Sequence, residues 1–138
     1  MTVQLREDAV QNNRLDIIDT AIGATGTFRI YTGAQPANCT SANTGTLLVT
    51  GNLPNPAFGA ASGGTMAKNG TWSWAASGGA ASTPGHFRIY NSQATMDGTT
   101  CQLQGDAAIG SGSLNMDGTI TSVQTVTISA FTFTEGND

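Results

Sequence analysis

The chain has 138 residues, a length that suits one domain spanning residues 1–138 with its own apolar core. Charged residues make up only 10% of it and the net charge is -4, so the five Lys and Arg residues weigh against a nucleic-acid binder. No run approaches the roughly 20 apolar residues of a membrane span, and no secretion signal follows Met1. We therefore expect a protein made in the cytoplasm that binds neither nucleic acid nor membrane.

The N-terminal segment 6–22 contains no Gly or Pro, and charged residues cluster in it, with six of the chain's 14. Apolar residues recur in it near the helical period, and this pattern predicts an amphipathic α-helix that ends at Gly23. The expected apolar stripe consists of Val10, Leu15, Ile17, Ile18, Ala21 and Ile22. Asp16 and Asp19 are expected to face water. The stripe covers an open face of a sheet in our preferred interpretation, and the alternative is that it docks onto a neighbouring subunit.

The rest of the chain, 27–134, begins with a strand that occurs twice. Phe-Arg-Ile-Tyr stands at residues 28–31 and again at residues 87–90. Because side chains alternate along a strand, each copy presents two residues to a core and two to the opposite face. The core pair of each copy gives Phe28, Ile30, Phe87 and Ile89. The opposite pairs are predicted surface contacts: Arg29, Tyr31, Arg88 and Tyr90.

Further short segments rich in Thr and apolar residues predict the other strands. The complete set is Thr27–Thr32, Gly45–Thr50, Thr65–Lys68, Thr71–Ala75, His86–Asn91, Thr100–Gln104, Gly112–Met116 and one long last strand, Val123–Thr134. Asn69-Gly70 between two of them is typical of a two-residue hairpin turn. About eight strands at this spacing indicate an all-β fold, an antiparallel β-sandwich or jelly-roll-like domain carrying the N-terminal helix.

Two long loops, 33–44 and 52–64, interrupt the strands. Pro54 and Pro56 in the second loop cannot donate to a sheet ladder, so they are expected at the surface, with Phe58 anchoring the loop in the core. Trp72 and Trp74 share one face of a strand, which predicts packed core, a platform for stacking a sugar or nucleobase, or a subunit contact. Core is the preferred interpretation. We assign Trp72 to the core together with Val126 and Ile128.

The residues predict no enzyme. His86 is the only histidine, and the first copy of the repeat has Thr27 in its place, which favours a structural role. Asp97, Asp106 and Asp117 are the carboxylates available for acid–base work, and two of them lie in Asp-Gly turns. Cys39 and Cys101 match no metal motif, so we expect reduced thiols packed as small apolar groups, and pairing between them stays open. We predict no catalytic residue, metal or cofactor.

Four stretches carry a resemblance to a known family. Residues 28–39, FRIYTGAQPANC, followed by TGTLL at 44–48, NPAFG at 55–59 and QTVTISAFT at 124–132, resemble small virion structural proteins of tailed bacteriophages. The resemblance implies a non-enzymatic protein of the phage head, a capsid decoration (cement) protein. It implies assembly into the virion in the host cytoplasm, with the major capsid protein or other virion proteins as partners.

Two alternatives to capsid decoration remain: a neck or tail (collar or ring) component of the virion, and a carbohydrate-binding module that uses Trp72 and Trp74. The Thr-rich strands have few charged residues to protect their edges, so we also expect a homo-oligomer. The expected contacts of a decoration protein are the two long loops, the N-terminal segment and the tail after Phe133.

Overall fold

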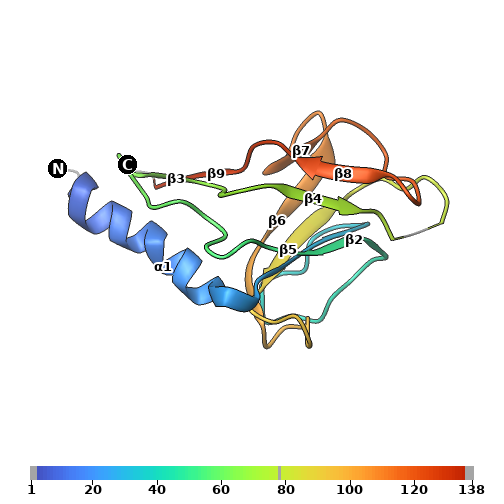
Figure 1. Ribbon diagram of the computed structural model, residues 1–138, viewed down its shortest axis with the longest axis horizontal. Helices are drawn as coiled ribbons and strands as arrows, with labels where there is room; N and C mark the ends of the chain where they lie inside the picture. Colours follow the sequence, from blue (N-terminus) through green and yellow to red (C-terminus); the bar gives the residue numbers. More distant parts are fainter. Residues whose placement is uncertain (1–2, 78, 136–138) are drawn as a thin grey trace.

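The computed structural model describes residues 3–77 and 79–135, and it confirms a mostly β fold with one N-terminal helix (Figure 1). The helical part comprises a π-helical turn Glu7–Gln11, helix α1 Asn12–Ile22 and a 3-10 turn Gly23–Thr25. The strands are β1 Thr27–Tyr31, β2 Leu47–Asn52, β3 Thr65–Ala67, β4 Trp72–Ala75, β5 His86–Tyr90, β6 Cys101–Ile109, β7 Leu114–Met116, β8 Thr125–Ile128 and β9 Thr132–Thr134.

Five strands form the main sheet in the order β2-β1-β5-β6-β7, and every pair except β6–β7 is antiparallel. The two copies of the repeated strand are direct neighbours at its centre. Arg29 of β1 lies opposite Arg88 of β5, so each copy's Phe faces the other copy's Ile. The repeat therefore places four large apolar side chains side by side on one face of the sheet.

A second layer packs over this apolar face. Its strands are β4 and β8, which pair antiparallel, and the β3–β9 ribbon continues the layer toward α1 (Figure 1). An isolated bridge between Val49 and Ala76 joins β4 to β2, with Ser77 N–H donating to the Leu48 carbonyl at 2.8 Å. Backbone hydrogen bonds thus connect the two layers along one side of the sandwich-like fold.

The core between the layers is aromatic. Trp72 is fully buried, with its ring centroid 5.7 Å from Phe28, 5.4 Å from Phe58 and 5.7 Å from Phe131. Each such ring contributes about 1.5–3 kcal/mol through removal of apolar surface from water. All eight residues predicted as core are buried: Phe28, Ile30, Phe58, Trp72, Phe87, Ile89, Val126 and Ile128.

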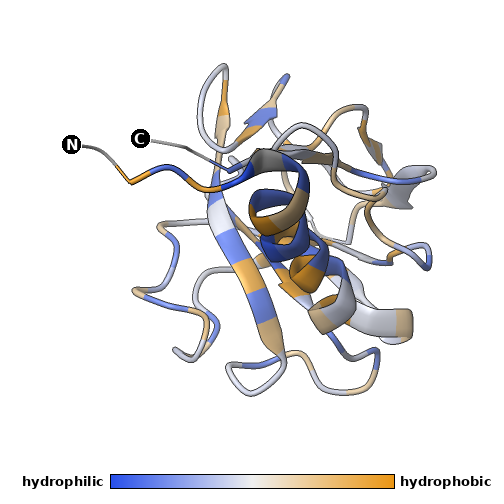
Figure 2. Ribbon diagram, turned by 90° about the vertical axis from the view of Figure 1, so that its left-hand side faces the viewer, coloured by the Kyte–Doolittle hydropathy of each residue, from blue (hydrophilic) through white to orange (hydrophobic). Residues whose placement is uncertain are grey.

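Helix α1 packs against its own chain, in front of the strands in the view of Figure 2. Leu15 and Ile22 are buried as predicted, but Val10 and Ile17 are 42% and 64% exposed, so the predicted stripe is wrong at these two positions. The helix turns a different face inward, because polar side chains on that face bind the backbone of the loop beside it.

These polar side chains form what we call the polar seam: Asn12, Asp16 and Asp19. Their Oδ1 atoms accept the backbone N–H groups of Gly64 at 3.0 Å, Ala61 at 2.8 Å and Phe58 at 2.9 Å. Residues 12, 16 and 19 share one face at helical spacing, and their partners follow at intervals of three along the loop. The seam corrects the expectation that Asp16 and Asp19 face only water.

Two other predictions of local structure are wrong. The predicted long last strand is divided into β8 and β9, because the chain leaves β4 after Ile128, buries Phe131 and then pairs with β3. Asn69-Gly70 does not close a hairpin, since β3 and β4 pair with different strands, and of its two residues only Gly70 has a positive φ. Tertiary pairing overrides the local turn signal at this point.

Candidate functional site

The outer face of the repeated strand carries the residues predicted as surface contacts, and the structure corrects three of them. Tyr31, Arg88 and Tyr90 are buried, and Arg88 has no exposed surface. The cover is the β1–β2 loop, residues 32–46, which folds across this face of the sheet. Arg29 is half-buried, Pro54 is partly exposed and Pro56 is exposed.

Arg88 uses all five of its N–H donors, three on that loop and two on Gln104 of β6. Nε and Nη2 donate to Gln104 Oε1 at 3.0 and 2.8 Å. Nη1 donates to the Ser41 carbonyl at 3.0 Å and to Asn43 Oδ1 at 2.7 Å, and Nη2 donates to the Asn38 carbonyl at 2.9 Å. A guanidinium offers five donors in a fixed plane, so this set of acceptors satisfies it completely. Arg88 is a structural clamp and has no donor left for a ligand.

Two tyrosines extend the network beside the clamp. The Tyr31 and Tyr90 hydroxyls lie 3.0 Å apart, and the Tyr90 hydroxyl donates to Asn43 Oδ1 at 2.8 Å. Burial, together with the contact to Tyr31, raises the pKa of Tyr90 well above its ordinary value. Tyr90 therefore stays protonated and donates to the loop, and Tyr31 supports Tyr90 from the neighbouring strand.

The two arginines of the repeat consequently differ in environment. Arg29 lies next to β2, where Nε donates to Thr50 Oγ1 at 3.2 Å and the longer Nη1 contact to the Tyr31 hydroxyl is 3.4 Å. Arg88 lies next to β6, where Gln104 faces it in the ladder. The strand that flanks each copy decides whether the loop can dock on its arginine.

His86 is fully buried and stacks on Tyr31, with ring centroids 5.1 Å apart. Nδ1 lies 3.0 Å from the Gly33 carbonyl oxygen, which can only accept, so Nδ1 carries the proton. Nε2 is buried without a partner among the described residues. Burial lowers the pKa of His86, so the ring is neutral and sealed from solvent. A general base needs access to the proton that it removes, and this ring has none.

The tryptophan pair packs into the core. Trp74 stacks on Phe28 at 5.4 Å between centroids with an interplanar angle of 17°. Its indole also covers Gly51, where an added Cβ would lie 2.0 Å from the ring. Trp72 and Trp74 donate their indole N–H groups to the backbone carbonyls of Asn69 and Asn52 at 3.0 and 3.2 Å. The two rings do not form an open platform for a sugar.

Two of the three candidate carboxylates, Asp97 and Asp106, bind the turn or loop beside them. Asp97 accepts Thr99 N–H at 2.8 Å, and Asp106 accepts Ser113 N–H at 3.0 Å. Hydrogen bonds from Thr99 and Ser113, first from the hydroxyls and then from the N–H groups, lower the pKa values of these two carboxyl groups. Within residues 3–77 and 79–135, no group of three His, Cys, Asp or Glu residues could hold a metal ion. No described helix is long and apolar enough to cross a membrane.

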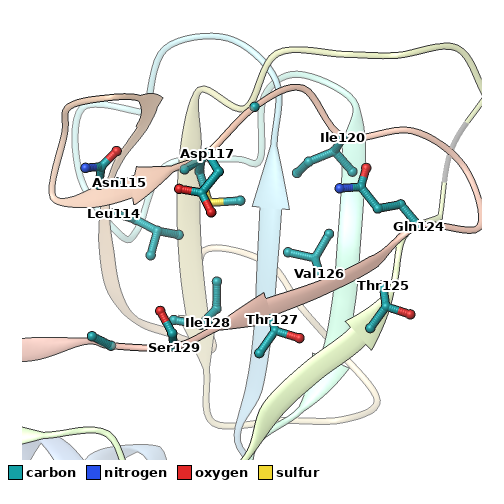
Figure 3. Close-up of a pocket in the computed structure, with 13 residues that line it drawn as sticks. Leu114, Asn115, Asp117, Ile120, Gln124, Thr125, Val126, Thr127, Ile128 and Ser129 are labelled. Atoms are coloured by element: carbon teal, nitrogen blue, oxygen red, sulfur yellow. The ribbon is translucent and has the colours of Figure 1, made fainter.

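A hollow lies on the side of the sandwich opposite the Val49–Ala76 bridge. It is a pocket of about 310 Å³ between β7 and β8, closed at one end by the turn that connects them, and we call it the β7/β8 gap (Figure 3). Its floor is formed by buried core side chains: Leu114, Met116, Ile120, Val126 and Ile128. Asp117 is the one charged residue in its lining.

The gap separates two open strand edges. β7 pairs only with β6 and β8 only with β4, and no backbone hydrogen bond joins β7 to β8 within the described chain. Ala76 N–H donates to the Gln124 carbonyl at 2.7 Å, so alternation along the ladder directs the backbone groups of Thr125 and Thr127 away from β4. Gly110 N–H donates to the Met116 carbonyl at 3.1 Å, so the backbone N–H and C=O groups of the preceding residue, Asn115, point away from β6.

The β7/β8 gap was not predicted from the sequence. Alternation of exposed Thr125 and Thr127 with buried Val126 and Ile128 identifies a strand with one buried face. The same alternation carries no information on which edge of the strand is paired. Only the placement of β4, β6 and β7 around the core leaves both edges open toward the same space.

The fold and this site define an all-β, sandwich-like domain that is bridged along one side and open along the other. Comparisons of the chain with protein-family models, with curated proteins and with solved structures find no match. The function is therefore argued from the resemblance of the sequence and from the geometry of the β7/β8 gap.

Proposed function

We propose that this chain is a non-enzymatic structural protein of a tailed-phage virion, and specifically a capsid decoration protein that attaches to neighbouring protein subunits. The observation that carries the proposal is the β7/β8 gap. Unpaired backbone groups on both of its edges and an apolar floor suit an extended polypeptide strand, which satisfies the edges while burying alternate side chains.

The direction of the strands supports this mode of binding. β7 and β8 run in opposite directions. β7 is parallel to β6, and β8 is reached from β6 through five successive antiparallel pairings, by way of β5, β1, β2 and β4. A strand inserted between them is antiparallel to one and parallel to the other, and it closes the open side of the sandwich. Asp117 at the border of the gap favours a basic residue at that end of the inserted strand.

The other side-chain clusters favour a structural role over a catalytic or sugar-binding one. Arg88 has no free donor, His86 is sealed, and Trp72 has no exposed surface. The low fraction of charged residues suits packing against other proteins. On a lattice, many weak copies of one contact add to stable attachment. The expected partners are the major capsid protein or another virion protein, or further copies of this chain.

The proposal is tested by imaging virions that carry the wild-type chain and a Thr127→Pro variant. Proline removes the N–H group that points into the gap, while the pairing of β8 with β4 uses Val126 and Ile128 and is retained. Thr127→Val is the matched control, because it loses the same hydroxyl contact to Ser73 and keeps the backbone donor.

We expect density for the wild-type and Thr127→Val chains at many capsid lattice positions, and no density for Thr127→Pro. A single ring at one vertex would identify a neck or tail component and refute decoration. Equal occupancy by all three chains would refute strand addition at the gap. Circular dichroism of the purified Thr127→Pro protein checks that the fold survives.

A further inference from the structure

The loop over Arg88 also brings the two cysteines together. Cys39 lies on the β1–β2 loop between the Asn38 and Ser41 carbonyls, both of which Arg88 binds. Cys101 begins β6 and faces Tyr90 in the ladder, two residues along β5 from Arg88. The same clamp that fixes the loop therefore determines where Cys39 lies relative to β6.

The same loop also rests on the turn before β6, where Asn43 Nδ2 donates to the Met96 carbonyl at 2.7 Å and a Cβ added at Gly98 would lie 2.2 Å from the Thr40 carbonyl oxygen. These contacts place Cys39 beside Cys101, and the pKa of the Cys101 thiol is raised by burial and by its neighbour Cys39. Both thiols are free, with Cys39 half-buried and Cys101 buried. A disulfide forms only between cysteines that the backbone already holds close, and most residue pairs in a fold fail this condition. Cys39 is on a loop and Cys101 is in a ladder, so Cys39 is the residue whose backbone adjusts when the bond forms.

We propose that Cys39 and Cys101 form a redox pair that closes to an intramolecular disulfide under oxidising conditions and covalently ties the β1–β2 loop to β6. The inference does not depend on the proposed function. It goes beyond the sequence, where the spacing of the two cysteines left their pairing open.

With oxidised glutathione as oxidant, the reaction proceeds by two thiol–disulfide exchanges. The Cys39 thiolate attacks glutathione disulfide, forms a mixed disulfide and releases one glutathione thiolate. The Cys101 thiolate then attacks the Cys39 sulfur and releases the second glutathione. In total, two protein thiols lose two protons and two electrons, and one glutathione disulfide becomes two glutathione molecules.

The environments of the two sulfurs assign these roles. Burial, followed by the hydrogen bond to Cys39, raises the pKa of Cys101 to about 12, which makes Cys101 a poor first nucleophile. Cys39 is more exposed and meets the oxidant first. Closure by Cys101 is the slow step, and its rate rises with pH because only the thiolate reacts.

The test is incubation of the full chain in glutathione buffers from reducing to oxidising, followed by intact mass and peptide mapping without reductant. We expect the mass to fall by two hydrogen atoms and a cross-linked peptide to join residues 39 and 101. We also expect the oxidised chain to unfold at higher urea concentration than the reduced chain, because the bond constrains the unfolded state.

Cys39→Ser is the matched control, since it removes the half-buried partner and leaves Cys101 in place. Its urea midpoint should be the same in both buffers. Three results would overturn the proposal: two free thiols persisting at the oxidising end, a disulfide between two chains in place of one within a chain, or a cross-linked chain that unfolds at lower urea than the reduced one.

Discussion

Replacement of Arg88 by alanine tests the clamp most directly, and Arg29→Ala is its control because the two residues face each other in the β1–β5 ladder. Arg88→Ala removes hydrogen bonds to four oxygens: the Asn38 and Ser41 carbonyls, Asn43 Oδ1 and Gln104 Oε1. Two of these oxygens keep another donor, because Ser41 N–H also binds the Asn38 carbonyl and the Tyr90 hydroxyl also binds Asn43 Oδ1. At about 1 kcal/mol net for each acceptor, the expected loss of unfolding free energy is about 4 kcal/mol.

Arg29→Ala removes one 3.2 Å hydrogen bond to Thr50 and a longer one to Tyr31, and it should cost about 0.5–1 kcal/mol. Arg88→Lys keeps the charge and loses the planar five-donor arrangement, so it should recover less than half of the loss. A domain of this size has a total unfolding free energy of about 5–15 kcal/mol, so the losses expected for the three variants can be told apart.

The assay is urea unfolding followed by tryptophan fluorescence, with native-state hydrogen exchange over residues 32–46. We expect exchange in this loop to accelerate strongly in Arg88→Ala and to stay unchanged in Arg29→Ala, because of the two arginines only Arg88 binds the loop. If Arg88→Ala costs no more than Arg29→Ala, the clamp does not hold the loop and the assignment of Arg88 as a structural residue fails.

Two further predictions concern His86 and the polar seam. Burial keeps the pKa of His86 below 6.5, so below that pH the unfolded chain binds a proton that the folded chain does not. Unfolding free energy should therefore decrease as the pH is lowered, by at most about 1.4 kcal/mol per pH unit. His86→Thr should remove this dependence in urea titrations between about pH 7 and pH 5. An unchanged slope in the variant would contradict the assignment. Asp19→Ala should lower stability by about 1–2 kcal/mol in thermal unfolding, and Asp19→Asn by less than half as much, because asparagine keeps the Oδ1 that accepts Phe58 N–H; equal losses would show that the hydrogen bond is not what matters.

Much of the fold could be predicted because it depends on patterns within single segments. Alternation in the repeated strand fixed which of its side chains enter the core, and all of them are buried. The absence of Gly and Pro between residues 6 and 22 predicted the helical segment, which extends from Glu7 to Ile22. Strand positions were predicted to within a few residues except at the end of β6 and at the division between β8 and β9.

The candidate site could not be predicted in the same way. Arg29 and Arg88 occupy the same position in two copies of one tetrapeptide. Alternation along the strand therefore predicts a solvent-facing side chain for both. One is half-buried and the other is fully buried, because a loop that is distant in sequence covers only one of them. Local sequence does not encode which loop lies over a strand, since that depends on the order of strands in the sheet.

The sequence by itself determined the β class, the helix, the apolar face of the repeat and the anchoring of Phe58 and Trp72. These features follow from side-chain periodicity, which acts over a few residues. Tertiary structure alone decided that Arg88 is a clamp, that Cys39 meets Cys101 and that β7 and β8 leave a gap. Each of these depends on contacts between segments far apart in the chain, where pairing and packing of the whole core select the neighbours.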